Sequence, residues 1–374
     1  MRIGVLGGGQ LGRMLALAGL PLGLEFTFLD PAEDPCAAAV GGHLRAPFTD
    51  PDALRELARI CQRVTYEFEN VPVQAASELA KTVPVYPPPA ALEVAQDRLA
   101  EKRFFRSVGI RTAEFESVAS PQDLKRAADR VGLPAVLKTR RMGYDGKGQR
   151  VLASGADLHA AWEALGGQDL LLEEFVRFRR ELSVLAARSQ SGEMVYYPVV
   201  ETHHEGGILR LSIAPAPDLS AALVEAAHGY ARRLLEALNY VGVLCLELFE
   251  TDGGLLANEM APRVHNSGHW TIEGACTSQF ANHIRAVAGL PLGSAQARGF
   301  CAMVNLIGQR PDPGAVLRVP GACYHWYGKV SRPGRKVGHV TVCAESWEVL
   351  QQRLGQLEQC GLYVPPRRLS APTP

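Results

Sequence analysis

The sequence predicts a protein of mixed α/β and α+β class, in which an N-terminal α/β domain is followed by a small domain and a larger C-terminal α+β domain. Three observations indicate this. Apolar strand-like runs alternate with amphipathic helical segments through the first hundred residues. Shorter elements separated by a glycine-rich turn then extend to residue 176. From Glu181 onward the strand-like runs are longer, which favours an α+β unit.

The N-terminal domain is expected to be a doubly wound layer of strands and helices. Its apolar and amphipathic runs predict strands at Arg2–Leu6, Glu25–Leu29 and Val64–Phe68, and helices at Gln10–Gly19 and Asp52–Cys61. A proline-rich stretch, Pro84–Pro89, ends this unit, and Ala90–Val108 has the pattern of one long amphipathic helix leading out of it. We place the domain boundaries at residues 1–104, 105–176 and 177–374.

The same patterns predict the elements of the two later domains. In the second domain they are strands Ala135–Thr139, Arg150–Ala153 and Leu170–Phe175, and helices Gln122–Val131 and Asp157–Leu165. In the third they are strands Glu181–Ala187 and Met194–Val200, helices Leu219–Leu238 and Ser278–Ala288, and a hairpin of Leu244–Glu250 with Leu255–Glu259. The tail Pro365–Pro374 is expected to be frayed.

Composition excludes several functional classes. Lys+Arg and Asp+Glu both number 39, and the basic residues are scattered, so no nucleic acid partner is expected. The eight cysteines include no C-x-x-C pair, which favours reduced thiols in the cytosol. No charged leader or run of 18 apolar residues is visible. We therefore expect a soluble cytoplasmic protein that has no membrane partner.

The most informative pattern is a pair of glutamates on the predicted hairpin. If the turn Thr251–Gly254 is centred on Gly253, residues whose numbers sum to 506 face each other, and this pairs Glu247 with Glu259. Two carboxylates that close repel each other unless a cation or a proton lies between them, and oxygen ligands suit Mg²⁺. A solvated hairpin with two surface acids is the alternative, but the run Val243–Phe249 is too apolar for a fully exposed strand.

Gly7–Gly12 matches G-x-G-x-x-G between a strand and a helix, and Asp30 ends the next strand. Alone, this motif is typical of a dinucleotide site. Physically, it brings backbone N–H groups and a helix N-terminus to an anion, and any phosphate would serve. A tight turn without a ligand is the third interpretation. The motif therefore leaves three interpretations open.

A second glycine-rich loop follows Lys138, which ends a buried strand. It carries Gly143, Gly146 and Gly148 with further basic residues, and it lacks the order of a P-loop. A hairpin lid over nucleotide phosphates fits this pattern, and a plain hairpin with a mobile tip is the alternative.

Taken together, five segments make the chain resemble the ATP-grasp superfamily, and within it the ligases that carboxylate aminoimidazole ribonucleotide in purine biosynthesis. They are residues 7–14, GGGQLGRM; 65–71, TYEFENV; 143–149, GYDGKGQ; 258–270, NEMAPRVHNSGHW; and 332–339, RPGRKVGH. The resemblance implies an ATP-grasp fold with a Rossmann-like pre-ATP-grasp N-terminal domain, a small lid domain and a C-terminal α+β domain. It also implies a homodimer.

The implied reaction uses ATP and Mg²⁺ as cofactors. ATP phosphorylates bicarbonate to carboxyphosphate, and the amine of aminoimidazole ribonucleotide takes up the carboxyl unit, directly or after release of CO₂. The products are N5-carboxyaminoimidazole ribonucleotide, ADP and phosphate. The expected partners are thus the small-molecule substrates ATP, bicarbonate and the ribonucleotide.

By matching positions, the resemblance implies roles for individual residues. Arg98 and Lys138 contact the ATP phosphates or base, residues 173–176 read adenine through backbone groups, and Glu181 takes the ribose hydroxyls. The full ATP-binding set is Arg98, Lys138, Gly143, Tyr144, Asp145, Gly146, Lys147, Gly148, Gln149, Glu173, Glu174, Phe175, Val176, Glu181, His204, Asn258 and Glu259.

The metal ligands implied are Glu247 and Glu259. The catalytic set is Asp145, Tyr144, Arg263, His265 and Lys329, where Arg263 and His265 receive bicarbonate and Asp145 polarises the attacking amine. The substrate-binding set is Gly9, Gln10, Leu11, Asn266, Lys329 and Arg335. Many ATP-grasp proteins have an Asn two residues after the second metal glutamate. Ala261 stands there in this chain, so no third protein ligand is assigned.

Three other classes remain as alternatives. A dehydrogenase would explain residues 1–30 but gives the hairpin glutamates no role. A sister ligase, such as a formate-dependent glycinamide ribonucleotide transformylase, shares the architecture, but residues 326–339 and 263–266 argue against it. A catalytically silent nucleotide-binding protein would not need Lys138, Asp145, Glu247 and Glu259 together.

Overall fold

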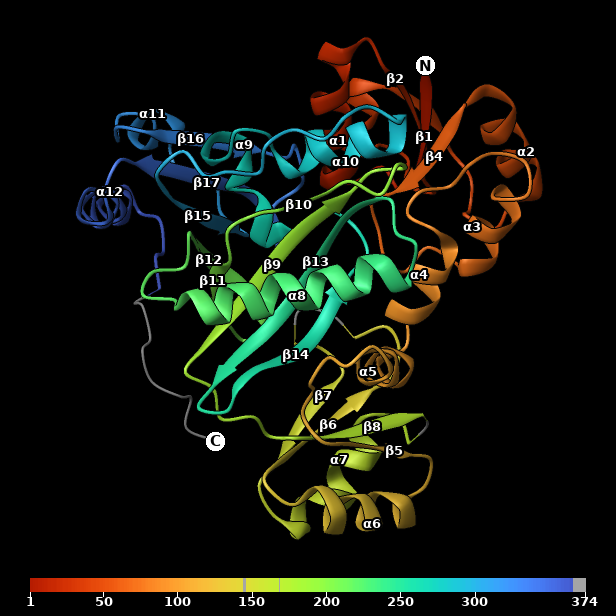
Figure 1. The fold of residues 1–374 in the computed structure, drawn as a ribbon, viewed down its shortest axis with the longest axis vertical. Helices are drawn as coiled ribbons and strands as arrows, with labels where there is room; N and C mark the ends of the chain where they lie inside the picture. The colour runs from red at the N-terminus through yellow and green to blue at the C-terminus, as the bar shows by residue number, and fades with distance from the viewer. Residues whose placement is uncertain (144–145, 168, 366–374) are drawn as a thin grey trace.

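Three β-sheets organise the computed structural model, which describes residues 1–143, 146–167 and 169–365 (Figure 1). The N-terminal sheet has the parallel order β3-β2-β1-β4. Its strands are β1 (Arg2–Leu6), β2 (Glu25–Leu29), β3 (Gly42–Leu44) and β4 (Arg63–Tyr66), and its helices are α1 (Gln10–Gly19), α2 (Pro51–Ile60) and α3 (Val73–Leu79). The doubly wound prediction is correct. Sequence patterns missed β3, whose three residues are too few to show an alternation, and α3, whose seven residues form only about two helical turns.

One long helix was predicted at Ala90–Val108, and this is wrong. The chain forms α4 (Pro89–Ala95) and α5 (Arg98–Ser107), which are separated by the extended residue Asp97. The Asp97 carboxylate caps α5 by accepting hydrogen bonds from the amides of Leu99 at 3.0 Å and Ala100 at 3.4 Å. It also pairs with Arg140 at 2.5 Å. A buried cap and ion pair thus override the continuous helical pattern.

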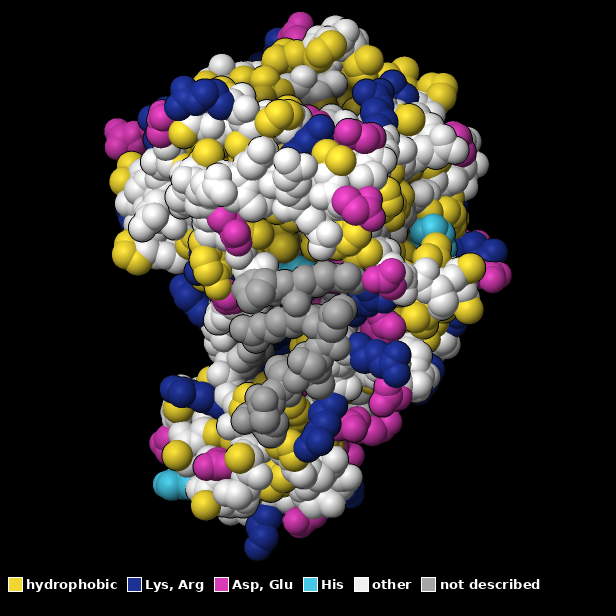
Figure 2. Space-filling view, turned by 90° about the vertical axis from the view of Figure 1, so that its left-hand side faces the viewer, with side chains coloured by type: hydrophobic (Ala, Val, Ile, Leu, Met, Phe, Trp, Pro, Cys, Tyr) yellow, Lys and Arg dark blue, Asp and Glu magenta, His cyan; other side chains and the backbone are white. Residues whose placement is uncertain are grey.

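A small lobe projects from the rest of the molecule and carries the antiparallel sheet β5-β8-β6-β7. Its elements are β5 (Phe115–Val118), α6 (Pro121–Val131), β6 (Ala135–Thr139), β7 (Gln149–Leu152), α7 (Leu158–Ala164) and β8 (Leu170–Glu174). Figure 2 shows the outline indented on the left between this lobe and the larger body, and it shows acidic and basic side chains intermingled on this face.

The third sheet is the largest, with the order β14-β13-β9-β11-β12-β15-β17-β16 and β10 paired to β9. Its strands are β9 (Arg180–Arg188), β10 (Met194–Tyr196), β11 (Val200–Glu205), β12 (Ile208–Ala214), β13 (Gly242–Thr251), β14 (Gly254–Ala261), β15 (Phe300–Ile307), β16 (Ala322–Trp326) and β17 (Lys336–Ala344). The helices after the small lobe are α8 (Ala221–Ala237), α9 (Thr271–Gly274), α10 (Gln279–Ala288), α11 (Pro313–Val316) and α12 (Trp347–Gln359).

The single strand predicted at Met194–Val200 is wrong. Instead, β10 and β11 both pair with β9, and Pro198 lies between them. Proline has no amide hydrogen to donate to a strand ladder, so the pairing with β9 is interrupted there.

Helices α8 and α10 cover opposite faces of the large sheet. Leu182, Val184 and Ala186 of β9 pack in the same core as α8, whereas Leu185 and Ala187 pack in the core of α10. This alternation is the two-residue period of a strand buried on both sides. The pattern made β9 predictable but did not show which helix covers which face.

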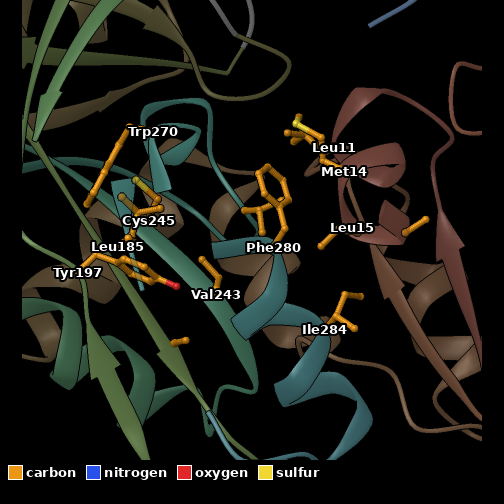
Figure 3. Close-up of a cluster of buried hydrophobic side chains, with 14 of the residues drawn as sticks. Leu11, Met14, Leu15, Leu185, Tyr197, Val243, Cys245, Trp270, Phe280 and Ile284 are labelled. Atoms are coloured by element: carbon orange, nitrogen blue, oxygen red, sulfur yellow. The ribbon is translucent and has the colours of Figure 1, made fainter. Parts of the chain in front are cut away.

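Helix α10 joins the N-terminal domain to the large sheet. Figure 3 shows Phe280 and Ile284 of α10 facing α1 of the N-terminal domain, with Val243 of β13 on the other side. His283 connects the same two bodies. Its Nδ1 accepts a hydrogen bond from the amide of Val243 at 3.1 Å, and its Nε2 lies 2.8 Å from the Thr65 hydroxyl on β4. The apolar contacts and these two bonds hold the N-terminal domain in place.

Across the described parts of the chain, every helix is too short or too polar to cross a membrane.

We predict that Asp97→Ala lowers the free energy of unfolding by about 1–3 kcal/mol, because α5 loses its cap and Arg140 loses a buried partner. Burial alone would raise the pKa of Asp97, but the hydrogen bond and charge of Arg140 outweigh it and lower that pKa. The contribution is therefore present at neutral pH and is lost as the pH falls through the folded-state pKa. Urea denaturation of wild type and variant at neutral pH measures the difference. The exposed first-turn acid Asp52 is the control, since Asp52→Ala should change stability by less than about 0.5 kcal/mol.

Candidate functional site

A cleft of about 610 Å³ lies where the three sheets meet, and it gathers most of the residues predicted from the sequence. Those that line it are Gln10, Leu11, Arg98, Lys138, Gly143, Gly146, Gln149, Glu173, Glu174, Phe175, Val176, Glu181, His204, Glu247, Asn258, Glu259, Arg263, His265 and Asn266. Gly9, Lys147, Gly148, Lys329 and Arg335 are described but do not line it. Tyr144 and Asp145 lie outside the described residues. A separate apolar pocket between β10 and α8 contains none of the predicted residues.

The two hairpin glutamates come together through a β-bulge. Beside the turn, Thr251 pairs with Gly254. The centre of the turn therefore lies half a residue before the predicted centre at Gly253. The register shifts between Leu246 and Leu248, and beyond the shift Leu246 pairs with Met260. Glu247 therefore lies opposite the bulged stretch that contains Glu259, close to the predicted pairing. Bulges re-aim side chains in this way beside functional sites.

Burial and mutual repulsion perturb this pair of carboxylates. Burial, and then repulsion from Glu259, raises the pKa of Glu247 to about 7. Glu259 accepts a charge-assisted hydrogen bond from Arg98 at 2.9 Å, and Glu247 lies 3.4 Å from Nε2 of His265. The two side chains thus share one polarised space, where a cation would lower the cost of ionising both carboxylates.

The neighbouring Asn258 supports the same interpretation. Its Oδ1 atom is buried and has no hydrogen-bond partner among the residues that the structure describes. No cluster of three or more His, Cys, Asp or Glu side chains suited to a metal is formed within the described ranges. Two carboxylates with an amide oxygen nearby fit a hard divalent cation that takes its remaining ligands from phosphate and water.

A buried charge network forms the base of the cleft. Glu173 Oε2 lies 2.8 Å from Lys138 Nζ and 3.4 Å from Lys102 Nζ. Burial alone would raise the pKa of Glu173, but Lys102 and Lys138 outweigh it and lower the pKa to about 2. Burial and the nearby Glu259 raise the pKa of Glu101 to about 8, and Glu101 accepts the amide of Met260 at 2.7 Å. The network fixes Lys138 at the end of β6.

Sequence reasoning missed Glu101 and Lys102. A signal was present, since Arg98, Glu101, Lys102 and Phe105 follow the i, i+3, i+4, i+7 spacing of one helix face. Phe105 indicates that this face of the helix is buried. Charged residues on a buried face indicate a functional site and not a solvated surface.

A histidine and a glutamate lie together in the cleft. Nδ1 of His204 is 2.9 Å from Glu181 Oε2. Burial alone would lower the pKa of His204, but the charge and hydrogen bond of Glu181 outweigh it and raise the pKa to about 9. His204 is therefore a cation at neutral pH.

Phe178 and Phe249 provide the apolar end of the cleft, where they stack with centroids 4.8 Å apart. Neither residue was predicted from the sequence, because single aromatic residues in strands and loops usually belong to the core.

Arg263, His265 and Asn266 line another part of the cleft, and each is held by a partner. Arg263 forms an ion pair with Glu69 and donates to the Val264 carbonyl at 2.8 Å. Asn266 and Asn305 exchange two amide hydrogen bonds, at 3.0 and 2.6 Å. The segment is therefore rigid before any ligand binds.

The glycine-rich N-terminal loop encloses a carboxylate of the protein itself. The amides of Gly9 and Gly12 donate to the two oxygens of Glu67, at 2.6 and 2.8 Å, and Gly8 donates to Asp30 at 2.7 Å. A Cβ on Gly9 would lie 2.5 Å from Glu67 Oε1, so a side chain there would displace the Glu67 carboxylate. Glu67 occupies the space that a dinucleotide pyrophosphate would need, which argues against a dehydrogenase.

Gln10 and Lys329 connect this loop to the cleft. Gln10 lines the cleft, and Lys329 donates a hydrogen bond to its side-chain oxygen. Arg335 is more distant and donates to the Val330 carbonyl at 3.1 Å. Lys336 lines the cleft beside it and was not predicted.

Comparison with known proteins places three families along the chain. Residues 1–96 match the ribonucleotide synthetase preATP-grasp domain, residues 103–280 the ATP-grasp domain and residues 301–353 the phosphoribosylaminoimidazole carboxylase C-terminal domain. The predicted fold class is confirmed.

Individual relatives agree along nearly the whole chain. N5-carboxyaminoimidazole ribonucleotide synthase of Pseudomonas aeruginosa is 53% identical over 96% of this chain and 99% of its own. The crystal structure of the Thermus thermophilus synthetase has a TM-score of 0.94 at 56% identity, and it covers 98% of this chain and 100% of its own. The Aspergillus clavatus synthase in complex with ADP and 5-aminoimidazole ribonucleotide has a TM-score of 0.90 at 34% identity, with 96% of this chain and 98% of its own covered.

We predict that Glu181→Gln lowers the pKa of His204 by more than about one unit, because the variant removes the charge that raises it. Since the folded-state pKa lies above that of an exposed histidine, the pair stabilises the protein fully below about pH 6.5, and this contribution is lost as the pH rises through about 9. NMR titration of the ring measures the pKa. Glu205→Gln, one residue beyond His204 on β11, is the control and should leave the pKa in place. An unchanged pKa in Glu181→Gln would contradict the assignment.

Proposed function

Because the chain belongs to the N5-carboxyaminoimidazole ribonucleotide synthase family of ATP-grasp ligases, we propose that it carboxylates 5-aminoimidazole ribonucleotide with ATP and bicarbonate. One observation carries this proposal for the site itself: a single cleft joins the Glu247–Glu259 pair and the Lys138 network to Arg263, His265 and Gln10. A phosphoryl donor and an acceptor thus have adjoining places.

The ATP end is assigned from charge and shape. Adenine fits the apolar end of the cleft at Phe178 and Phe249, beside the edge formed by residues 173–176. Lys138 and Arg98 are the cations for the phosphates, and Glu181 accepts the ribose hydroxyls. A divalent cation held by Glu247 and Glu259 would neutralise charge on the phosphates during transfer.

The first chemical step joins bicarbonate to phosphorus. An anionic oxygen of bicarbonate attacks the γ-phosphorus, the bond to the β-phosphate oxygen breaks, and ADP leaves. Arg263 and His265 hold the bicarbonate, because they lie beside the metal glutamates and carry hydrogen-bond donors.

The second step transfers the carboxyl unit to nitrogen. The exocyclic amine of aminoimidazole ribonucleotide forms the new C–N bond, the bond between carbon and the phosphate oxygen breaks, and a proton leaves the amine. We assign proton removal to Asp145, with Tyr144 beside it, and both positions fall outside the described residues. Gln10, Leu11, Asn266, Lys329 and Arg335 are assigned to the ribonucleotide and its phosphate.

The test is incorporation of labelled bicarbonate into aminoimidazole ribonucleotide, measured together with phosphate release from ATP. We expect one labelled product and one phosphate for each ATP consumed. Phosphate release driven by formate with glycinamide ribonucleotide, and not by these substrates, would overturn the proposal in favour of the formate-dependent ligase.

We predict that Glu259→Gln abolishes ATP turnover while the protein stays folded. The variant halves the charge of the carboxylate pair, so the cation and the transferring phosphate lose their counter-charge. Phosphate release at saturating Mg²⁺ measures turnover, and circular dichroism checks the fold. Glu163→Gln, an exposed acid on α7, should keep wild-type turnover. Wild-type turnover in Glu259→Gln would remove the metal assignment.

A further inference from the structure

His265 is held on its backbone by a fully buried glutamine. The amide of His265 donates to Oε1 of Gln279 at 2.8 Å, and Nε2 of Gln279 donates back to the carbonyl of His265 at 2.7 Å. Gln279 is the first residue of α10 and is 0% exposed. Both ends of the amide group hold the His265 backbone, which fixes its position and direction, and Nε2 of Gln279 also lies 3.3 Å from Nδ1 of His269.

The imidazole ring of His265 is held by a second buried group. Its Nδ1 lies 2.9 Å from the hydroxyl of Ser267 and accepts the backbone amide of Ser267 at 3.3 Å. The Ser267 hydroxyl in turn accepts a hydrogen bond from Ser183 at 2.8 Å. Ser183 and Ser267 are both 0% exposed.

The direction of these bonds determines which ring nitrogen carries the proton. A backbone amide can only donate, so the lone pair of Nδ1 is engaged and the proton of a neutral ring resides on Nε2. Ser183 donates to Ser267, and the nearer acceptor for the Ser267 proton is Nδ1 at 2.9 Å, with Sγ of Cys245 at 3.7 Å. Nε2 lies on the other side of the ring, 3.4 Å from Glu247 and inside the cleft.

We propose that Ser267 and Gln279 are positioning residues, which hold His265 with its Nε2–H directed into the cleft as a hydrogen-bond donor to the carboxyl-bearing substrate. The identity of that substrate as bicarbonate rests on the proposed function. Bicarbonate already has an anionic oxygen to attack phosphorus, so the first step requires no base at His265. A fixed donor stabilises the negative charge on the bicarbonate oxygens that do not react.

The first experiment observes the ring directly. Histidine is labelled with ¹⁵N in the full-length protein, and the His265 signals are identified by their loss in His265→Ala. The chemical shifts of the two ring nitrogens show which one carries the proton. We expect the proton on Nε2 in the wild-type protein. A proton on Nδ1 would overturn the proposal whatever the reaction proves to be.

The second experiment is kinetic. Ser267→Ala and Gln279→Leu should each lower kcat/KM for bicarbonate by about tenfold, while KM for ATP changes less than about twofold. Ser189→Ala is the control for a buried serine, and Gln190→Leu is the control for an exposed glutamine that bonds to backbone carbonyls. Ser189 is a buried serine just beyond β9, and Gln190 donates to backbone carbonyls at the other end of α10, at 3.1 and 3.0 Å. Both controls should keep the wild-type value.

A double-mutant cycle separates positioning from a general structural role. If Ser267 acts only through His265, Ser267→Ala should have no further effect on kcat/KM for bicarbonate in a His265→Ala background. If Ser267→Ala lowers kcat/KM for bicarbonate by the same factor in the wild-type and the His265→Ala backgrounds, the proposal is overturned. Ser267→Ala removes one oxygen atom and keeps the test available if Gln279→Leu fails to fold. If the wild-type protein shows no bicarbonate-dependent phosphate release, the proposed function fails, and the ring signals still decide the positioning.

Discussion

The arrangement of the site depends on how helix α10 is buried between the N-terminal domain and the large sheet. One side of α10 packs on α1 through Phe280 and Ile284, and the other packs on β9 and β13. Burial also lowers the pKa of His283 to about 3, so this histidine stays neutral while it connects β4 to β13. The glycine-rich loop belongs to one body and the Glu247–Glu259 pair to the other. The packing of α10, together with contacts such as Arg263 with Glu69, therefore holds them at a set separation.

The same helix links packing to chemistry. Its apolar side chains set its position, and its first residue, Gln279, holds His265. Buried ion pairs such as Glu173 with Lys102 and Lys138 contribute little net stability, because desolvation offsets their attraction. Their value lies in geometry, since they keep Lys138 extended toward the cleft. Packing thus determines where these charged groups lie, and buried cations and carboxylates are placed next to each other.

Much of the fold and part of the site could be predicted from local patterns. The bounds of β1, α1, β2 and β6 were correct to the residue, because each has a clear period and strong end signals. The helix break at Asp97 could not be predicted, since it depends on Arg140, more than forty residues away. The sequence patterns also missed β15, whose partners β12 and β17 are distant in the sequence. Spacing alone paired Glu247 with Glu259, and spacing could also have indicated Glu101, whereas Phe178 and Gln279 required the folded chain.

Glu67 gives the glycine-rich loop a property that its sequence motif conceals. An anion arriving from solution would compete with a carboxylate that is tethered in place, which acts as a ligand at very high effective concentration. The backbone amides with which such a loop usually binds phosphate are therefore already occupied by Glu67. What remains for a substrate is the outward side of the loop, Gln10 with Lys329, where a ligand would be recognised by side chains instead of by backbone amides. In this chain, a motif shared with nucleotide-binding enzymes binds a carboxylate of the protein itself. A match to the motif in a related chain therefore indicates a nucleotide site only if the residue equivalent to Glu67 is checked as well.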